Sequence, residues 1–284
     1  METLRTVAQM KIWVRRLLCN GESIGLVPTM GYLHEGHLSL IHRARSENSA
    51  VVASIFVNPT QFGPREDFTT YPRDPEADSV KCRDAGVDAL FMPEVEDMYG
   101  PESQTHVEVE RVSAPLCGAS RPGHFRGVAT VVLKLFNIVA PTAAYFGAKD
   151  YQQLQVIKTM ARDLNLDVSV VACPTLREPD GLAMSSRNAY LTENQRKQAV
   201  CLFQALLEAQ GLFNKGETKA ENYVEVMSAR IRREPDAVVD YISLVHPETL
   251  EKLEAVNGPA LAALAVRMGK TRLIDNMVLG RDGT

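Results

Sequence analysis

The hydrophobic pattern of the first 175 residues switches repeatedly between two forms. Short, nearly continuous apolar runs predict strands buried on both faces, whereas apolar residues three or four apart predict helices. The predicted strands are 23–27, 50–57, 87–92, 143–147 and 166–172. The predicted helices are 4–18, 37–45, 75–85, 127–139 and 150–165, with a short extended piece at 105–112. This alternation predicts an α/β fold with a Rossmann-like, doubly wound parallel sheet, whose ligand site lies at the carboxyl ends of the strands.

Turn-forming residues set the expected ends of several elements. Pro28 should end the first of these strands, because proline has no N–H for a sheet ladder. Asp74 and Pro75 predict a helix start through N-cap and first-turn chemistry, and Gly86 predicts the end of that helix.

The pattern changes after residue 174. From 174 to 187, Pro, Gly, Ser and charged residues predict a loop with a function rather than a core element. The capping-box sequences Thr-Glu-Asn-Gln at 192–195 and Thr-Lys-Ala-Glu at 218–221 predict helices that run to about 214 and 233. Strands are expected at 238–245 and 261–268. We therefore expect a Rossmann-like domain at 1–175 and a smaller C-terminal α+β domain at 176–284.

Composition narrows the class of protein. The chain has 284 residues, 45% of them hydrophobic, which is enough for a sizeable core. Its net charge of −4 argues against a protein that coats nucleic acid. Five scattered cysteines argue against a disulfide framework and a structural zinc site, and no apolar run is long enough for a membrane span. We expect a soluble, cytoplasmic protein with neither a nucleic-acid nor a membrane partner.

The stretch 27–37 joins a predicted strand to a predicted helix through residues that suit an anion site. Gly31 and Gly36 allow unusual backbone conformations, and the N–H groups at a helix start attract anions. His34 and His37 lie three apart, so both imidazoles can lie over one helix face. They are compatible with ordinary helix-start histidines, phosphate donors or metal ligands. Zinc is the weakest of these, because the metalloprotease pattern needs histidines four apart.

Several motifs together resemble one known family. His34-Glu35-Gly36-His37 resembles the H-x-G-H signature of the nucleotidylyltransferase superfamily, and nearly the whole chain resembles its pantothenate synthetase (pantoate-β-alanine ligase) family. The matching segments are Phe-Val-Asn-Pro-x-Gln-Phe at 56–62, Tyr-Pro-Arg at 71–73, Arg-Pro-Gly-His-Phe-Arg-Gly at 121–127, Phe-Gly-x-Lys-Asp-Tyr-Gln-Gln at 146–153, and Asp-Gly-Leu-Ala-Met-Ser-Ser-Arg-Asn at 180–188. The resemblance implies ATP-dependent joining of pantoate to β-alanine through a pantoyl adenylate. It also implies Mg²⁺ and a homodimer.

The resemblance also assigns roles to residues of this chain. The catalytic positions are His34, His37, Lys149, Ser185, Ser186 and Arg187. The ATP-binding positions are Met30, Gly31, Tyr32, Leu33, His34, Glu35, Gly36, His37, Gly147, Ala148, Lys149, Asp150, Leu176, Met184, Ser185, Ser186 and Arg187. The pantoate and β-alanine positions are Asn58, Gln61, Gln153, Arg121 and His124, and the magnesium position is Asp78. The C-terminal domain would close as a lid that shields the adenylate from water.

Each assignment has a simpler structural alternative. Lys149 could be a solvated lysine at a helix start, although the helix dipole disfavours a cation there. The serines at 185 and 186 could cap a helix, Arg121 could belong to a structural turn, and Asp78 could lie on a solvated face. The alternatives to the ligase are another H-x-G-H nucleotidylyltransferase, which the two glutamines at 61 and 153 disfavour, and a non-catalytic ATP-binding regulator. No basic appendage supports a tRNA synthetase.

Overall fold

The computed structural model describes residues 1–64 and 66–280 of the chain. Its backbone divides into two compact units. Unit 1 comprises Met1–Glu110, Arg121–Ala148 and Gln153–Cys173. Unit 2 comprises Arg111–Ser120, Lys149–Gln152 and the segment from Pro174 onward.

Unit 1 is built on a six-stranded sheet in which every neighbouring pair is parallel. The strand order is β1-β4-β3-β2-β5-β6. The central strands β2 to β5 are almost entirely buried, as expected of strands that helices cover on both faces. The strands are β1 (Glu2–Leu4), β2 (Ile24–Thr29), β3 (Ala50–Ile55), β4 (Ala89–Phe91), β5 (Ala143–Gly147) and β6 (Ser169–Cys173). The prediction of a doubly wound parallel sheet is confirmed.

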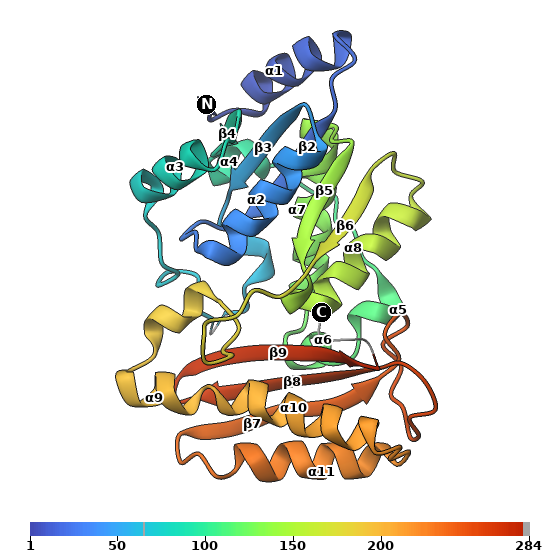
Figure 1. The fold of residues 1–284 in the computed structure, drawn as a ribbon. Coiled ribbons are helices and arrows are strands. Elements are labelled where there is room, and N and C mark those ends of the chain that lie inside the picture. Colours follow the sequence, from blue (N-terminus) through green and yellow to red (C-terminus); the bar gives the residue numbers. More distant parts are fainter. Residues whose placement is uncertain (65, 281–284) are drawn as a thin grey trace. The chain divides into compact units, whose positions relative to one another are not determined.

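Helices connect these parallel strands. Figure 1 shows α2 on the near side of the sheet and α7 on its far side, and both pack against β2. Asp74 caps α3 by accepting the Ala77 N–H at 3.0 Å, as predicted. The helices are α1 (Val7–Cys19), α2 (Glu35–Glu47), η1 (Pro59–Gln61), α3 (Pro75–Asp84), α4 (Val95–Met98), α5 (Glu110–Ser113), α7 (His124–Val139), η2 (Ala148–Asp150) and α8 (Tyr151–Asp163), where α5, η2 and α8 each span a boundary between the units.

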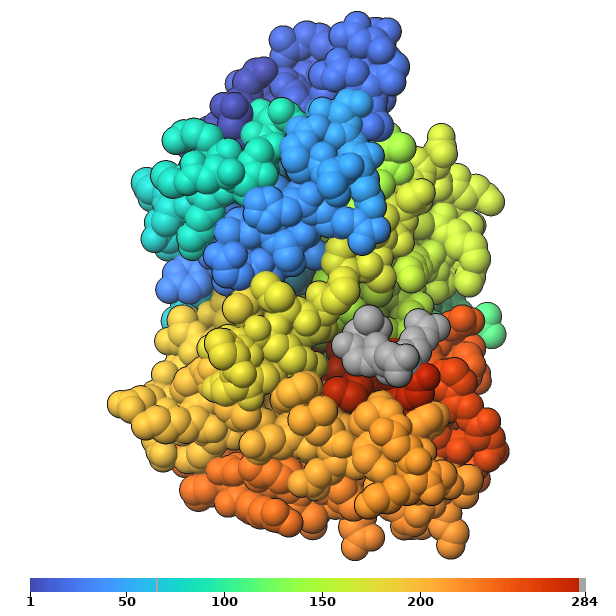
Figure 2. All heavy atoms as spheres, viewed as in Figure 1, coloured from blue at the N-terminus to red at the C-terminus, as the bar shows by residue number. Residues whose placement is uncertain are grey.

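Unit 2 contains a three-stranded antiparallel sheet of order β7-β8-β9. The strands are β7 (Ala237–Val245), β8 (Ala260–Met268) and β9 (Thr271–Leu279). Helix α10 packs on β8 and β9, α11 packs on α10 and β7, and the outer sides of both helices are open to solvent (Figure 2). The helices are α6 (Cys117–Ser120), η3 (Ser186–Tyr190), α9 (Glu193–Gln198), α10 (Cys201–Asn214) and α11 (Ala220–Ile231). The expected small α+β domain is confirmed, with a strand, β9, that the apolar pattern did not predict.

Pro28 does not end its strand. Strand β2 continues to Thr29, and Pro28 lies opposite Ser54 of β3. The Thr29 carbonyl accepts the N–H of Phe56, so the alternating backbone turns Pro28 toward the β5 side. Pairing with β5 has already stopped at Leu26, so no ladder bond is lost.

Four further expectations about the elements are wrong. Leu4 ends strand β1 rather than starting the first helix, and of the expected extended piece 105–112, residues 105–109 lack regular structure and residues 110–112 belong to α5. The helix that starts after Thr192 breaks between α9 and α10. Lys219, not Thr218, is the N-cap of α11 and makes no side-chain capping bond, while the Glu217 carboxylate accepts the N–H groups of both residues at 2.7 and 2.8 Å.

Candidate functional site

The strand order of unit 1 reverses between β2 and β5. From β2 the chain continues through β3 to β4 on one side, whereas β5 and β6 extend the sheet on the other side. Ligands of open α/β sheets bind at the carboxyl ends of the strands at such a reversal. The loop from Met30 to His34 leaves β2 at this point, and β5 ends there at Gly147, which Ala148 follows. The fold therefore brings these two predicted ATP-binding segments to one edge of the sheet.

His34 and His37 both cap the start of helix α2. The Gly36 N–H donates to Nδ1 of His34 at 3.1 Å, and the His34 N–H donates to Nδ1 of His37 at 3.3 Å. Their ring centroids lie 4.1 Å apart. The two histidines thus form a capping box, in which each side chain accepts one backbone N–H.

The capping bonds indicate which tautomer each imidazole takes when it is neutral. A nitrogen that accepts a backbone N–H carries no proton, so each neutral ring holds its proton on Nε2. A protonated Nδ1 would face an N–H donor and break the cap. The pair is therefore set up as two Nε2–H donors at the start of a helix, where the dipole favours an anion.

The loop before α2 has a left-handed backbone that helix α3 holds. Gly31 and Tyr32 have φ values of 83° and 52°. The N–H groups of Tyr32 and Leu33 donate to the two carboxylate oxygens of Asp78, each at 2.7 Å. Nζ of Lys81 donates to the Leu33 carbonyl at 2.6 Å. The loop is thus bound at both its donor and its acceptor groups.

Asp78 is 1% exposed, and its burial raises the pKa of the carboxyl, although the two backbone bonds act in the opposite direction. Both oxygens already accept a backbone N–H, which fits poorly with a direct magnesium ligand. Among the described residues, no group of three or more His, Cys, Asp or Glu side chains could hold a metal ion. Magnesium ligation by Asp78 stays a prediction.

Asn58 and Gln61 form a buried amide pair beside the loop. Nδ2 of Asn58 donates to Oε1 of Gln61 at 3.0 Å and to the Gly127 carbonyl at 3.1 Å. Nε2 of Gln61 lies 3.2 Å from Sδ of Met30. These contacts fix the orientation of the Gln61 amide and bring three of the predicted ATP and substrate residues together.

Arg121 and His124 lie behind Gln61 in a charged network. Arg121 donates to both carboxylate oxygens of Glu66 at 2.7 Å and lies 2.9 Å from Nε2 of His124. Nδ1 of His124 is 2.8 Å from the Gln61 carbonyl. Burial raises the pKa of the Glu66 carboxyl, but the bonds from Arg121 lower it by more, so the pKa falls to about 2. The cation predicted to bind substrate is thus neutralised by Glu66, and both basic residues support the Gln61 backbone.

Other predicted site residues lie in unit 2. Nζ of Lys149 is 3.8 Å from a carboxylate oxygen of Asp150, and the Lys149 side chain is 19% exposed. Asn276 of β9 donates to the Lys149 carbonyl at 2.8 Å. Lys149 is therefore more enclosed than a solvated lysine at a helix start. Gln153 lies on α8 and belongs to unit 1.

The predicted phosphate loop is ordered rather than a free linker. The Met184 N–H donates to the Leu176 carbonyl at 3.0 Å. Ser185 is the N-cap of η3 and accepts the Arg187 N–H at 3.3 Å, so the capping alternative holds for this serine. Ser186 is buried, and Leu176 is 40% exposed.

Sequence reasoning missed Lys81 and Glu66. Lys81 follows Asp78 by three positions on α3, a spacing that places both on one helix face and could have paired them. No sequence signal separates Glu66 from any other loop carboxylate.

No helix in the described residues is long and apolar enough to cross a membrane.

Comparisons with known proteins find similarity over nearly the whole chain. A family model described as pantoate-beta-alanine ligase matches residues 2–278. The pantothenate synthetases of Thermotoga neapolitana and Geobacter sulfurreducens are each 54% identical to the chain, over 99% of it and 100% of each relative.

Two solved structures are similar as well. The crystal structure of pantothenate synthetase from Thermus thermophilus has a TM-score of 0.93 and 49% identity, covering 98% of this chain and 99% of that one. The pantoate-beta-alanine ligase from Francisella tularensis, described as complexed with beta-gamma ATP and beta-alanine, has a TM-score of 0.82 and 36% identity, covering 98% and 97%.

Proposed function

Because this chain belongs to the pantoate-β-alanine ligase family, we propose that it joins pantoate to β-alanine in an ATP-dependent ligation. The single observation that carries this proposal is the match with pantothenate synthetases over nearly every residue of both chains. The enzyme forms a C–N bond and yields pantothenate, AMP and pyrophosphate.

The reaction takes two steps. A carboxylate oxygen of pantoate attacks the α-phosphorus of ATP, and pyrophosphate leaves. The amine of β-alanine then attacks the carbonyl carbon of the pantoyl adenylate, loses a proton and displaces AMP. The first step brings two anions together and builds charge on the leaving pyrophosphate, so fixed donors are the main need.

The histidine pair meets that need in unit 1. His34 and His37 would donate from Nε2 to phosphate oxygens, because their Nδ1 atoms accept backbone N–H groups. Lys149, Ser185, Ser186 and Arg187 would hold the phosphates, with Met184 in the same loop as the two serines. Asp150 would bind the ribose, and Leu176 would contact the adenine.

The remaining roles follow the same logic. Gln61 and Gln153 would bind pantoate, with Asn58 orienting Gln61 through its 3.0 Å bond. Magnesium would arrive bound mainly by the phosphates of ATP, where it neutralises charge. We also propose that the domain at 176–284 shields the adenylate from water and that the protein is a cytoplasmic homodimer.

The direct test supplies ATP, magnesium, pantoate and β-alanine and measures pyrophosphate and AMP. Pyrophosphate release should require pantoate, and AMP release should require β-alanine as well. Pyrophosphate release that ignores pantoate would overturn the proposal in favour of another nucleotidyl transfer, and no turnover would favour a regulator.

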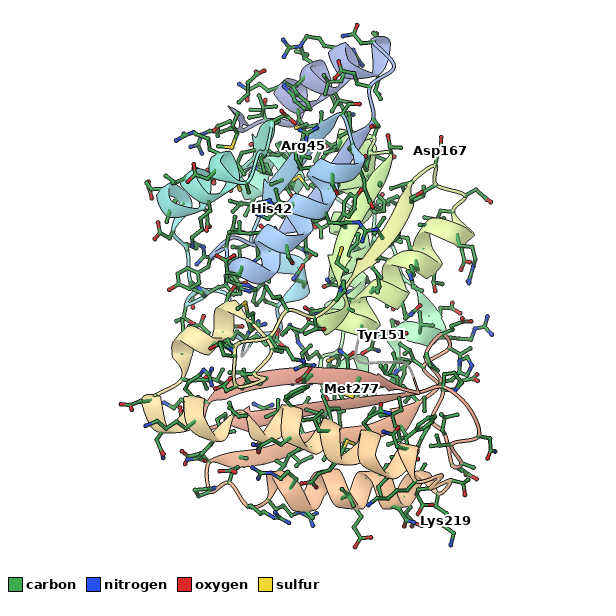
Figure 3. All side chains as sticks on the ribbon, viewed as in Figure 1. His42, Arg45, Tyr151, Asp167, Lys219 and Met277 are labelled. Atoms are coloured by element: carbon green, nitrogen blue, oxygen red, sulfur yellow. The ribbon has the colours of Figure 1, made fainter. Side chains whose placement is uncertain are left out.

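Single variants test the donors. His37→Ala and Lys149→Ala should lower the single-turnover rate of adenylate formation by ~10²-fold or more. His42→Ala is a matched control, because His42 is exposed on the same helix α2 (Figure 3). Near-normal rates in both donor variants would exclude these roles.

A further inference from the structure

Two residues of helix α3 bind the loop 31–33 in a way that no metal role explains. Asp78, in the first turn of α3, accepts the N–H groups of Tyr32 and Leu33. Lys81, one turn later, donates to the Leu33 carbonyl. The carboxylate and the ammonium thus hold successive backbone groups of opposite polarity. We name this arrangement the α3 clamp.

The loop needs such a clamp because its backbone is strained. Tyr32 has a φ of 52°, a region that L-residues with a side chain rarely occupy. Without a compensating contact, the chain would relax to other conformations. Two charge-assisted bonds at 2.7 Å, made to adjacent N–H groups, favour this one conformation.

The space around Gly31 shows how closely the clamp fits the loop. A Cβ at this position would lie 3.0 Å from Oδ2 of Asp78 and 3.0 Å from Cγ2 of Ile55. Thr29 holds the other end, because its Oγ1 accepts the Gly31 N–H at 3.1 Å and donates to the Ser54 carbonyl at 2.8 Å. The loop is therefore fixed on both sides of its left-handed residues.

We propose that Asp78 and Lys81 are positioning residues, which preset the loop 31–33 so that the histidines beyond it are in place before a nucleotide arrives. The proposal rests on the role of this loop in ATP binding that is proposed above. A site that is competent only part of the time binds its ligand more weakly in proportion to that fraction. Loosening the clamp should therefore raise the KM for ATP more than it lowers kcat.

The main variant is Asp78→Asn, which keeps the shape but turns one acceptor into a donor that faces a backbone N–H. Lys81→Met removes the ammonium and keeps the stem. Glu76→Gln is the matched control, because Glu76 lies in the same first turn, carries the same charge and is exposed.

The first measurement is amide hydrogen exchange of the ligand-free protein. Exchange at Tyr32 and Leu33 should accelerate by ~10-fold or more in Asp78→Asn and remain at the wild-type rate in Glu76→Gln. Unchanged exchange at both amides would overturn the clamp, whatever the protein catalyses. If Asp78→Asn does not fold, exchange at the His34 amide in Lys81→Met decides the question in the same way, because that amide shares its peptide group with the Leu33 carbonyl that Lys81 binds.

The second measurement is kinetic. The KM for ATP should rise by ~10-fold, with kcat and the half-saturating magnesium concentration near wild type. A variant that merely loses folded protein would lower kcat at constant KM, and a variant that loses a metal ligand would be rescued by excess magnesium. Either result would overturn the positioning role, while accelerated exchange without any ligase activity would instead reject the proposed function.

Discussion

Gly127→Ala offers a sharp test of how unit 1 holds its substrate residues. Gly127 lies in helix α7 against the turn η1, which carries Gln61. Gly211 lies within helix α10, where an added Cβ meets nothing within 4 Å. Both substitutions are the same chemical change inside a helix, and propensity alone predicts a gain of ~0.8–1 kcal/mol for each.

The structure predicts opposite outcomes for the pair. A Cβ at position 127 would lie 2.4 Å from the Thr60 carbonyl oxygen and 2.7 Å from the Gln61 nitrogen, whereas ordinary contact begins at 3.4 Å. Because both atoms belong to the backbone, the helix and the turn must separate by about 1 Å. Such overpacking costs ~1–3 kcal/mol, which outweighs the propensity gain in most of that range. A shift of this size in a substrate-holding group can also lower the rate by ~10²-fold.

Calorimetry and steady-state kinetics measure the two effects. Gly127→Ala should lower the thermal midpoint and the kcat/KM for pantoate, whereas Gly211→Ala should raise the midpoint slightly at constant kcat/KM. Equal gains in stability for both variants would refute the steric reasoning. A lower midpoint with an unchanged kcat/KM would refute the placement of Gln61 at pantoate.

Three other predictions follow from the ionisable groups. Because the pKa of Glu66 is lowered, its pairing with Arg121 stabilises the fold fully above pH 4.5, and this stabilisation is lost as the pH falls toward 2. In acid denaturation, Glu66→Gln should therefore flatten the loss of stability across that pH window. An unchanged profile would contradict the pairing. At a pH where both rings are neutral, nitrogen NMR of His34 and His37 should show the proton on Nε2, and a proton on Nδ1 in either ring would contradict the capping geometry. Arg177→Met should lower the free energy of unfolding by ~3–5 kcal/mol in denaturant titration, because Asp275 is 3% exposed and loses both of its guanidinium bonds. Adding Asp275→Asn should recover part of that loss. Equal stability of the single and double variants would refute this cause.

The buried charge of Asp275 also explains which part of the fold was not predictable. Strand β9 places this carboxylate at a buried position of its alternating pattern, where sequence reasoning expects an apolar residue. The position is acceptable because the distant Arg177 donates to the carboxylate at 2.6 and 3.0 Å and the neighbouring Asn276 N–H donates to it at 2.8 Å. Continuous apolar runs such as β3 were predictable, because their burial needs no partner of that kind.

The site shows the same division. The strand-loop-helix order around His34 and His37 was readable from the sequence, because apolar runs and glycines mark it. The use of their Nδ1 atoms as helix caps depends on side-chain rotation, which no residue pattern specifies. The bonds from Asp78 to the loop 31–33 were not readable for a related reason, since Leu33 lies 45 positions earlier in the chain.

The parallel sheet has a consequence for synthesis on the ribosome. Strand β1 emerges first, yet its partner is β4, where Glu2 lies opposite Ala89. At ~5–20 residues per second, the first strand waits several seconds for that partner. Strand β2 pairs with β3 much earlier, since Ile24 lies opposite Ala50. The centre of the sheet can therefore nucleate while the N-terminal strand is still unpaired, and a chaperone that shields nascent chains would meet β1 as an open edge.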